Sequence, residues 1–368
     1  MTSDKKKKSI SFFLPNLEVG GAEKVIVSLA NKLYDRGYKV EILVSSKSGN
    51  LINQINNKII IRNFSAKRVL FSFNKLNKYL RNNAPDILFA THTHTAFVSF
   101  FCIALNSFKT KLILRKAISP GISFSENFLY KFIIIFVSKI NLYFANTIIV
   151  PSMRMLVDLK NSNKPIRDKF FHIYNPIDFE RIRKKSKSDE KNYFTGKYLL
   201  AVARLQKQKD FYTLIKAFKT VSNKYKVNLL ILGEGDDRKS IEKYIISCNL
   251  ENRICMPGIV ENPYYYMKRC ELFVHSSKAE GLPNSLLQAI CLNKVVVCTD
   301  CDYGPREIIE GSNFGKLVPV GDHNLMASQI NKLLSNKEKL LANKEFLKKF
   351  EIEKIVDDFE KVLFLRDE

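Results

Sequence analysis

The feature that most constrains the fold is a regular alternation of short apolar runs with amphipathic helical patterns. Residues 10–14 form an apolar run that leads through Gly20 and Gly21 into residues 24–34, where apolar side chains recur at helical spacing. A second apolar run follows at residues 40–44. A strand, a glycine turn, a helix and another strand make a βαβ unit, which favours a parallel sheet.

The alternation continues along the chain but is interrupted once, near the middle. It breaks at Asn175-Pro176-Ile177-Asp178, and residues 180–191 are charged without an apolar rhythm, which is typical of a linker. The length of 368 residues also exceeds the size at which one hydrophobic core keeps growing. We therefore predict an N-terminal domain at residues 1–178, a C-terminal domain at residues 179–345, and a helix at residues 346–368 that packs back toward the N-terminal domain.

Each domain is expected to hold one doubly wound parallel sheet. The most apolar stretch, residues 132–150, is interrupted by Lys139, Asn141 and Asn146, whereas a membrane-spanning helix needs about 20 mostly apolar residues. We interpret it as a helix end, a turn and a buried strand at residues 147–150. The other expected strands are at residues 59–61, 87–90 and 112–114 in the first domain and at residues 198–203, 228–232, 254–256, 272–275 and 295–298 in the second.

The chain carries a formal net charge of +24, which indicates a negatively charged partner. Nucleic acid, an anionic membrane surface and a phosphorylated substrate are the three possibilities. Residues 5–8 are four consecutive lysines, either a solvated tail or a segment attracted to a membrane. The helical stretch at residues 69–81 is either an amphipathic element that contacts a membrane or a pyrophosphoryl lipid, or a half-buried helix with a solvated face. Its basic positions, with those just before it, are Lys67, Arg68, Lys75, Lys78 and Arg81.

The seven cysteines make an odd set without the spacing of a disulfide framework, and no apolar leader follows the first residues. A reducing cytosol is the expected compartment. Cys298 and Cys301 form a C-x-x-C pair, which would suit a redox site or half of a zinc site, but the sequence has no second pair of ligands at suitable spacing. We interpret them as two buried thiols at a strand end and expect no metal.

Loops that follow the predicted strands of the second domain carry the candidate chemistry, because ligands of open α/β sheets bind at the carboxyl ends of the strands. Arg204 and Lys209 place two cations between a strand and a helix that begins near residue 211, where free backbone amides already favour anions. A diphosphate suits this site, since arginine can hold two phosphate oxygens at once. Two ordinary surface cations are the alternative.

Three further loops follow strands in the same way. Gly233-Glu234-Gly235 is small and permits close approach of another group. Glu280 precedes a helix that has Pro283 in its first turn, and Gln288 lies eight residues after Glu280, so both side chains can reach toward one ligand. A carboxylate and an amide suit the hydroxyls of a ribose or hexose; a helix cap and a solvated polar face are the alternative. The last loop, residues 302–307, opens another helix.

Six motifs occur in a fixed order between residues 10 and 345. This ordered set resembles the family 4 retaining glycosyltransferases of the GT-B fold. The resemblance implies an α/β protein with two Rossmann-like doubly wound domains that face each other across a cleft. The motifs are Gly20-Gly21-Ala22-Glu23, Tyr174-Asn175-Pro176-Ile177-Asp178, Arg204 with Lys209, Gly233-Glu234-Gly235, Glu280-Gly281-Leu282-Pro283-Asn284 and Gly304-Pro305-Arg306-Glu307-Ile308-Ile309.

The resemblance also implies a UDP-sugar donor in the C-terminal domain, an acceptor in the N-terminal domain, and retention of the anomeric configuration without a metal or other cofactor. Arg204 and Lys209 match cations that stabilise the charge of the leaving UDP, and Glu280 matches an acid near the donor sugar. Gln288 replaces a second acid that holds the ribose, which costs about 1 kcal/mol of charge-assisted hydrogen bonding. The implied donor-binding residues are Gly20, Gly21, Arg204, Lys209, Gly233, Gly235, Glu280, Gly281, Leu282, Pro283, Asn284 and Gln288.

Two histidines follow the predicted strand at residues 87–90, in the loop where enzymes of this family place a polar residue against the sugar. We favour His92 over His94 for this contact. His92 therefore joins Glu280, Arg204 and Lys209 as a predicted catalytic residue. Two solvent-facing histidines are the alternative.

We therefore predict transfer of a hexose or N-acetylhexosamine from UDP to a lipid-linked or surface-polysaccharide glycan, by a cytoplasmic protein that lies peripherally on the inner face of a bacterial membrane. The motifs are most similar to those of enzymes that extend undecaprenyl-diphosphate-linked or capsular glycans. Gln288 leaves an inactive relative as an alternative. A nucleic-acid-binding protein would rest on net charge alone, without an RNP-type or zinc-finger pattern, and an oxidoreductase would need G-x-G-x-x-G after the first strand.

Overall fold

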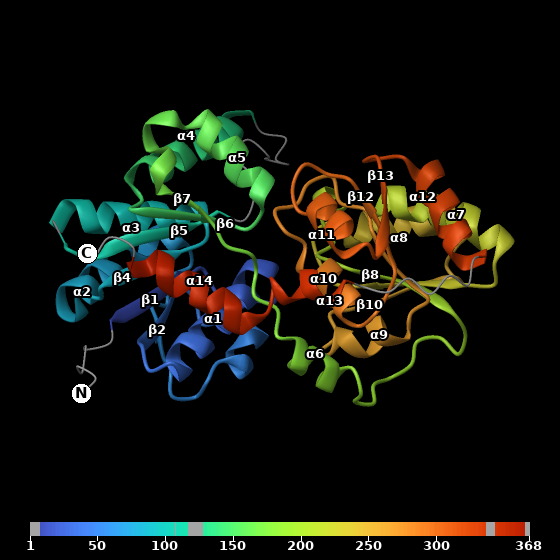
Figure 1. Ribbon diagram of the computed structural model, residues 1–368, viewed down its shortest axis with the longest axis horizontal. Coiled ribbons are helices and arrows are strands. Elements are labelled where there is room, and N and C mark those ends of the chain that lie inside the picture. The colour runs from blue at the N-terminus through green and yellow to red at the C-terminus, as the bar shows by residue number, and fades with distance from the viewer. Residues whose placement is uncertain (1–7, 107, 117–127, 336–342, 365–368) are drawn as a thin grey trace. The chain divides into compact units, whose positions relative to one another are not determined.

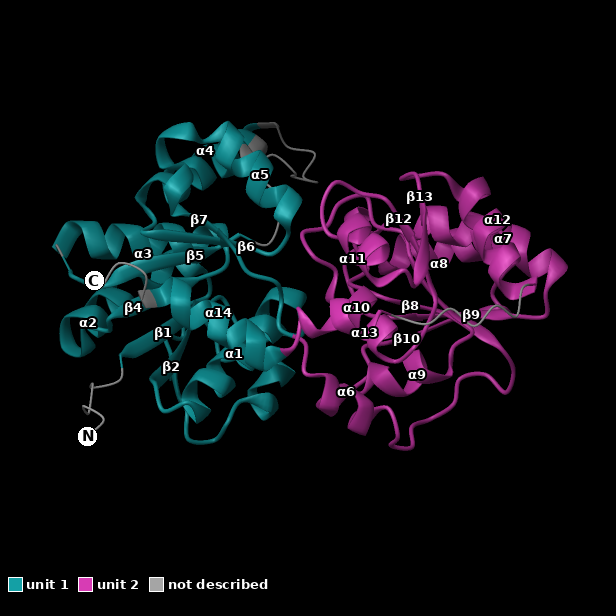
Figure 2. Cartoon of the chain, in the orientation of Figure 1, with its two compact units in different colours: residues 1–176, 352–368 teal, residues 177–351 magenta. Residues whose placement is uncertain are grey.

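The computed structural model describes residues 8–106, 108–116, 128–335 and 343–364, so three of the four lysines at residues 5–8 lie outside the described residues. The chain divides into two compact units: unit 1 has residues 1–176 and 352–368, and unit 2 has residues 177–351 (Figure 2). Each unit holds one parallel sheet with helices packed on it (Figure 1). The predicted α/β fold with two Rossmann-like domains is confirmed.

Unit 1 is built on a seven-stranded sheet of strand order β3-β2-β1-β4-β5-β6-β7. The winding of this sheet reverses between β1 and β4. In chain order the elements of unit 1 are β1 (Ser9–Leu14), α1 (Gly21–Asp35), β2 (Lys39–Val44), η1 (Asn50–Gln54), β3 (Ile60–Asn63), η2 (Val69–Ser72), α2 (Phe73–Asn83), β4 (Ile87–Ala90), α3 (Thr93–Asn106), β5 (Lys111–Arg115), α4 (Phe128–Phe144), β6 (Thr147–Val150), α5 (Met153–Ser162), η3 (Lys164–Lys169), β7 (Phe170–His172) and α14 (Ile352–Phe364).

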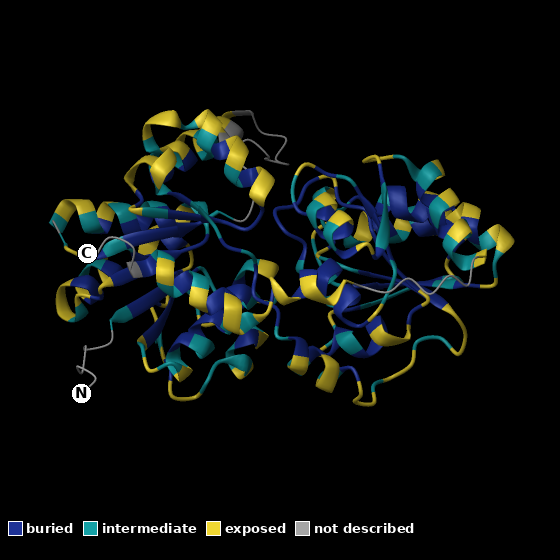
Figure 3. Cartoon of the chain, viewed as in Figure 1, coloured by how far each residue is buried: buried dark blue, intermediate teal, exposed yellow. Residues whose placement is uncertain are grey.

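Both faces of this sheet are covered, because successive side chains of a strand point to opposite sides. On β1, Phe12 packs in the core that α1 and α14 complete, whereas its neighbour Phe13 packs in the core formed with α2 and α3. The strands are accordingly mostly buried (Figure 3). The continuous apolar runs that predicted strands thus reflect burial on both sides.

The C-terminal helix α14 belongs to unit 1 and packs on α1. Its buried face includes Ile355 and Phe359, and the Phe359 ring lies 6.0 Å from that of Phe89 on β4. On the rim of this contact, Arg36 of α1 forms ion pairs with Glu353, Asp357 and Glu360 of α14. The last helix therefore completes the core of the first unit.

Unit 2 is built on a six-stranded sheet of order β10-β9-β8-β11-β12-β13, in which the winding reverses between β8 and β11. Its core lies largely between the sheet and the helices α7, α8 and α12. In chain order the elements of unit 2 are α6 (Phe179–Lys185), β8 (Tyr198–Val202), η4 (Lys207–Lys209), α7 (Phe211–Lys224), β9 (Asn228–Leu232), α8 (Arg238–Ser247), β10 (Ile254–Gly258), α9 (Pro263–Arg269), β11 (Leu272–His275), α10 (Asn284–Cys291), β12 (Val296–Thr299), α11 (Pro305–Ser312), β13 (Gly315–Val318), α12 (His323–Ser335) and α13 (Lys344–Lys348).

The charged segment at residues 180–191, predicted to be a linker, begins in helix α6. Asp178 caps this helix by accepting a hydrogen bond from the backbone N–H of Arg181 at 2.9 Å. Phe179 and Ile182 are buried. Two apolar residues at a spacing of three suffice to anchor so short a helix, and charged neighbours conceal them in the sequence.

Candidate active site

Two loops meet where the strand order of unit 2 reverses. Open α/β sheets bind ligands at the carboxyl ends of their strands at such a reversal. The loop after β8 carries Lys209, and the loop after β11 carries Glu280. The Nζ atom of Lys209 lies 2.5 Å from Oε1 of Glu280. The structure therefore brings these two predicted residues together.

The Glu280 carboxylate is buried, and three side chains hold its Oε1. Besides Lys209, the Oγ of Ser277 donates to it at 2.7 Å and Nε2 of His275 lies 3.0 Å away. Burial raises the pKa of Glu280, but the Lys209 charge and the His275 hydrogen bond outweigh this effect and hold the pKa well below its usual range. At neutral pH, Glu280 is therefore a hydrogen-bond acceptor and not an acid.

Backbone contacts fix the two loops to one another. The side chain of Gln208 donates from Nε2 to the carbonyl of Ala279 at 2.6 Å, and the backbone N–H of Lys278 donates to the carbonyl of Gln208 at 2.8 Å. The Oγ of Ser276 donates to the carbonyl of Lys209 at 2.7 Å. The ion pair is thus preorganised by the backbone as well as by its own attraction.

Asp210 directs the chain from Lys209 into helix α7. It lies in the left-handed region with φ of 46°, a conformation that aspartate adopts more readily than most residues. Its carboxylate caps α7 by accepting from the backbone N–H of Thr213 at 3.5 Å, and it also accepts from the Oγ1 of Thr213 at 2.7 Å. Lys209 is therefore held at the N-terminus of a long helix, where backbone amides already favour an anion.

The two glycines after β9 serve the loop that carries Arg204. A Cβ on Gly233 would lie 1.9 Å from the carbonyl oxygen of Ala203, and one on Gly235 would lie 2.2 Å from that of Leu205. The close approach predicted for these glycines is therefore to the neighbouring backbone. Arg204 lies between those two residues, and its side chain is exposed.

The fourth motif loop supports the loop of Glu280. Gly304 has φ of +83°, and a Cβ there would lie 2.6 Å from the carbonyl oxygen of Gly281 and 2.9 Å from Cα of Leu282. Pro283 precedes α10 as its N-terminal cap residue. Farther along, Asn284 and Gln288 lie half-buried on α10, in its first and second turns.

A second contact between a carboxylate and a basic side chain lies at the reversal of strand order in unit 1. Glu23 is in the first turn of α1, after β1, and His92 follows β4. The Nε2 of His92 lies 3.2 Å from Oε1 of Glu23, and its Nδ1 lies 2.9 Å from Oγ1 of Thr91. Both ring nitrogens of His92 are thus engaged, whereas the neighbouring His94 has an exposed side chain.

Gly20 and Gly21 form the N-terminus of α1, just before Glu23 in the first turn of this helix. Gly20 is the N-terminal cap residue of this 15-residue helix, and the position of a Cβ on Gly21 has no atom within 4 Å. The first turn of α1 is therefore open at Gly21, and its amides favour an anionic or oxygen-rich group.

Arg115 at the end of β5 is buried near this pair, with 2% of its surface exposed. Its guanidinium donates to Oδ1 of Asn175. Burial lowers the pKa of Arg115 to about 10, and the charge of Glu23 offsets part of that effect. Among the described residues, Nη1 of Arg115 has no hydrogen-bond partner. Unit 1 thus contains a buried cluster of charged groups beside its strand reversal.

The chain matches two sequence families along its length. The model described as Glycosyl transferases group 1 matches residues 178–350, and the model described as Glycosyltransferase Family 4 matches residues 19–181. The chain is also 31% identical over 304 residues to an uncharacterized glycosyltransferase of Methanocaldococcus jannaschii, covering 77% of this chain and 73% of that protein. This chain belongs to the family 4 glycosyltransferases of the GT-B fold. The family predicted from the ordered motifs is confirmed.

The glycosyltransferase is also similar to an enzyme whose name states its acceptor and the sugar that it transfers. It is 28% identical over 336 residues to the N-acetylgalactosamine-N,N'-diacetylbacillosaminyl-diphospho-undecaprenol 4-alpha-N-acetylgalactosaminyltransferase of Campylobacter jejuni, covering 89% of this chain and 91% of that protein. Among solved structures, Anabaena Alr3699/HepE in complex with UDP-glucose matches with a TM-score of 0.79 at 18% identity, covering 97% of this chain and 99% of that one. At this identity the structural likeness concerns the fold.

Among the titratable side chains of the glycosyltransferase sites, Glu23, Arg115 and His275 were not predicted as site residues. The signal for Glu23 was present, because it occupies the same helical stripe as the buried Ile26 and Ala30. An acid in an apolar stripe needs a buried partner. For Arg115 and His275 the only signal was a polar residue ending an apolar run.

The cysteine pair of the glycosyltransferase is buried and unbridged. Burial raises the pKa of Cys301 to about 12 and that of Cys298 well above its usual value, which disfavours reactive thiolates. Among the residues that the structure describes, no three His, Cys, Asp or Glu side chains gather in a group that could hold a metal ion. Within the same ranges, none of the helices has both the length and the apolar character needed to cross a membrane.

Proposed function

We propose that this glycosyltransferase moves a hexose or N-acetylhexosamine from a UDP-sugar to a lipid-linked or surface-polysaccharide glycan, with retention of the anomeric configuration. The observation that carries the proposal is the preorganised pair of Lys209 and Glu280 at the strand reversal of unit 2. The names of similar proteins support it: one is an N-acetylgalactosaminyltransferase for a diphospho-undecaprenol glycan, and another was solved with UDP-glucose.

Two cations would serve the diphosphate of the donor. The ammonium of Lys209 has three N–H groups, of which the contact with Glu280 uses one. The exposed guanidinium of Arg204 adds a fork that matches phosphate oxygens. As the bond to the sugar breaks, negative charge collects on UDP, and both cations stabilise it. We propose catalysis without a metal, because these side chains supply the charge that a divalent cation would otherwise supply.

The remaining donor contacts follow from the hydrogen-bonding capacity of each group. Glu280 stays ionised and accepts hydrogen bonds from hydroxyls of the donor sugar, while Gln288 accepts one from the ribose. We assign Gly281, in the loop of Glu280, and Asn284, at the start of α10, to the same donor site. We assign Gly20, Gly21 and His92 of unit 1 to the sugar and the acceptor. Peripheral contact with the inner face of an anionic membrane is part of this proposal, since a lipid-linked acceptor resides there.

Donor binding is tested by thermal unfolding with UDP-, GDP-, ADP- and TDP-sugars. A ligand that binds only the folded state stabilises it by about 2.7 kcal/mol at roughly a hundredfold excess over Kd. We expect a UDP-sugar to raise the unfolding temperature of the wild type, but not that of Arg204→Ala or Lys209→Ala. Lys216→Ala, which removes an exposed cation from α7, is the matched control and should respond like the wild type.

Transfer itself is tested by UDP release with the stabilising donor and an undecaprenyl-diphosphate-linked glycan, with and without EDTA. Retention is read from the anomeric coupling constant of the product by NMR. Donor binding without release for any acceptor would indicate an inactive relative. No stabilisation by any sugar nucleotide, together with salt-sensitive binding of nucleic acid, would overturn the proposed function.

A further inference from the structure

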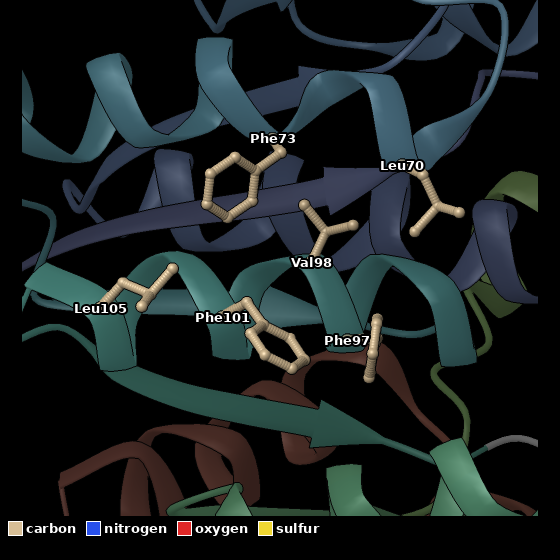
Figure 4. Close-up of a pocket in the computed structure, with 6 residues that line it drawn as sticks. All are labelled: Leu70, Phe73, Phe97, Val98, Phe101 and Leu105. Carbon is tan, nitrogen blue, oxygen red and sulfur yellow. The ribbon is translucent and has the colours of Figure 1, made fainter.

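Unit 1 contains a pocket of about 340 Å³ whose lining side chains are all apolar (Figure 4). It lies between η2 with the start of α2 on one side and α3 on the other. No lining side chain offers a hydrogen-bond donor or acceptor, so the pocket suits a hydrocarbon chain and not a sugar or nucleotide. The lining residues are Leu70, Phe73, Phe97, Val98, Phe101 and Leu105.

The surface around this pocket exposes large apolar side chains. Leu70, Phe71 and Leu105 are 56%, 68% and 69% exposed. Soluble proteins leave single apolar side chains on their surfaces, but a contiguous group of this size marks a contact with a partner or a membrane.

Helix α4 extends the apolar surface. Its exposed residues Leu129, Phe132, Ile133 and Phe136 recur at spacings of three and four, so an apolar stripe of this helix faces solvent (Figure 3). Helix α4 packs on α3, where the Phe144 ring stacks on that of Phe100 at 4.1 Å. Exposed apolar side chains thus lie on α3 and on α4, two helices that pack on each other.

The segment that carries this face is strongly basic. Residues 64–157 contain twelve Lys and Arg residues and two Asp and Glu residues. Exposed basic side chains lie just before η2, on α2 and after α3, the elements that line the pocket or adjoin them. They are Lys67, Arg68, Lys75, Lys78, Arg81 and Lys109. An apolar centre with a basic rim matches the boundary between the headgroups and the acyl chains of an anionic lipid bilayer.

We infer that this face, formed by η2, α2, α3 and α4 of unit 1, docks on an anionic lipid bilayer, with one hydrocarbon chain of the bilayer in the pocket. The basic rim argues against a second copy of the chain as the occupant, because a two-fold contact would oppose like charges. The inference deepens the proposed function and rests on it, because a lipid-linked acceptor lies in such a bilayer. Docking itself requires neither donor nor catalysis.

Cosedimentation with vesicles tests the docking surface. We expect the wild type to bind vesicles of phosphatidylglycerol and phosphatidylcholine, and to bind phosphatidylcholine alone far less. Leu105→Asp and Phe132→Asp should each weaken binding roughly tenfold or more, since each replaces an apolar side chain that would enter the bilayer with a charged one. Lys78→Glu should weaken binding only to the anionic vesicles. Ile246→Asp, at an equally exposed apolar position of unit 2, should bind like the wild type.

The absence of tryptophan from the sequence allows a direct reporter. With anionic vesicles, Leu105→Trp should shift its emission to the blue and be quenched by lipids brominated in the acyl chain, whereas Ile246→Trp should show neither change. Equal behaviour of the two variants would overturn the inference. So would a change in sedimenting mass of Leu105→Asp without vesicles, which would identify a contact between copies.

The outcomes separate docking from the proposed function. Leu105→Asp should keep its stabilisation by a UDP-sugar, which shows that the variant is folded and binds donor. Vesicle binding in a protein that no sugar nucleotide stabilises would leave the docking surface standing and remove the transferase proposal. Donor binding in a protein that does not bind anionic vesicles would overturn the docking surface and leave the transferase proposal standing.

Discussion

The Nε2 of His92 lies 3.2 Å from Oε1 of Glu23, and this pair joins the loops after β1 and β4. The pair of Lys209 and Glu280 joins the loops after β8 and β11. Each unit thus places a carboxylate beside a basic side chain across the reversal of its strand order, where open α/β sheets bind ligands.

We expect Glu23→Gln to slow glycosyl transfer by about a hundredfold at most, because a displaced imidazole loses its orientation toward the reacting groups. Stabilisation by the donor, which we assign to unit 2, should persist. Since Glu23 would act through His92, the double variant Glu23→Gln with His92→Ala should be no slower than His92→Ala alone. Independent, multiplying losses would contradict this relation.

The ionised Glu280 should make stability depend on pH in the acidic range. Its pKa in the folded state lies below its ordinary value of 4.5, so it contributes stability that is present above pH 4.5 and is lost as the pH falls below it. Urea unfolding of Glu280→Gln should therefore differ from that of the wild type mainly above this pH. Lys209→Met removes the main charge that lowers the pKa of Glu280, and should weaken the same dependence.

Gly235 is predicted to be essential for the loop that carries Arg204. An added Cβ would lie 2.2 Å from a backbone oxygen, so Gly235→Ala should cost about 1–3 kcal/mol and displace the loop. Donor-induced stabilisation should fall as well. Gly196→Ala is the control, because a Cβ there meets no atom within 4 Å. Equal unfolding midpoints for the two variants would show that the loop adapts.

Asp210 joins stability to donor binding through the cap of α7. Asp210→Ala should destabilise the protein by about 1–2 kcal/mol, because it removes the cap and leaves a residue with a Cβ but no polar group at a positive φ. Asp210→Asn should be close to the wild type, since asparagine caps helices and tolerates that conformation. Chemical denaturation with and without a UDP-sugar measures both effects.

The contact of α14 with α1 should depend on its apolar core and little on its charged rim. Phe359→Ala should cost about 3–5 kcal/mol, as expected for a buried phenylalanine. Arg36→Ala should cost about 1 kcal/mol or less, because two of its three partners on α14, Glu353 and Asp357, are more than half exposed. Denaturant unfolding of the two variants decides between these contributions.

The strands inside the sheets could be predicted because they are buried on both faces. The expected strands at residues 147–150, 228–232 and 272–275 have the observed bounds of β6, β9 and β11. Strands β7 and β13 were not predicted. They lie at sheet edges and are only partly buried, so they lack the continuous apolar run of an interior strand.

The sequence could place site residues on loops, but it could not place them against one another. Lys209 and Glu280 were each expected at the carboxyl end of a strand, and parallel strands share that edge. Their contact depends on strand order, because β8 and β11 are neighbours although β9 and β10 separate them in the chain. The site role of Arg115 could not be predicted either, since its hydrogen-bond partner Asn175 comes from a distant part of the sequence.

The place of α14 in unit 1 has a consequence for synthesis. A chain leaves the ribosome from its N-terminus, and domains generally fold as units once their residues are available. All of unit 2 has been made by residue 351, whereas unit 1 still lacks α14. The later-made unit therefore completes its core first. Until residues 352–364 emerge, nascent unit 1 presents the apolar surface that Phe359 will cover, and a stop codon before residue 352 would leave that surface open for chaperones or aggregation.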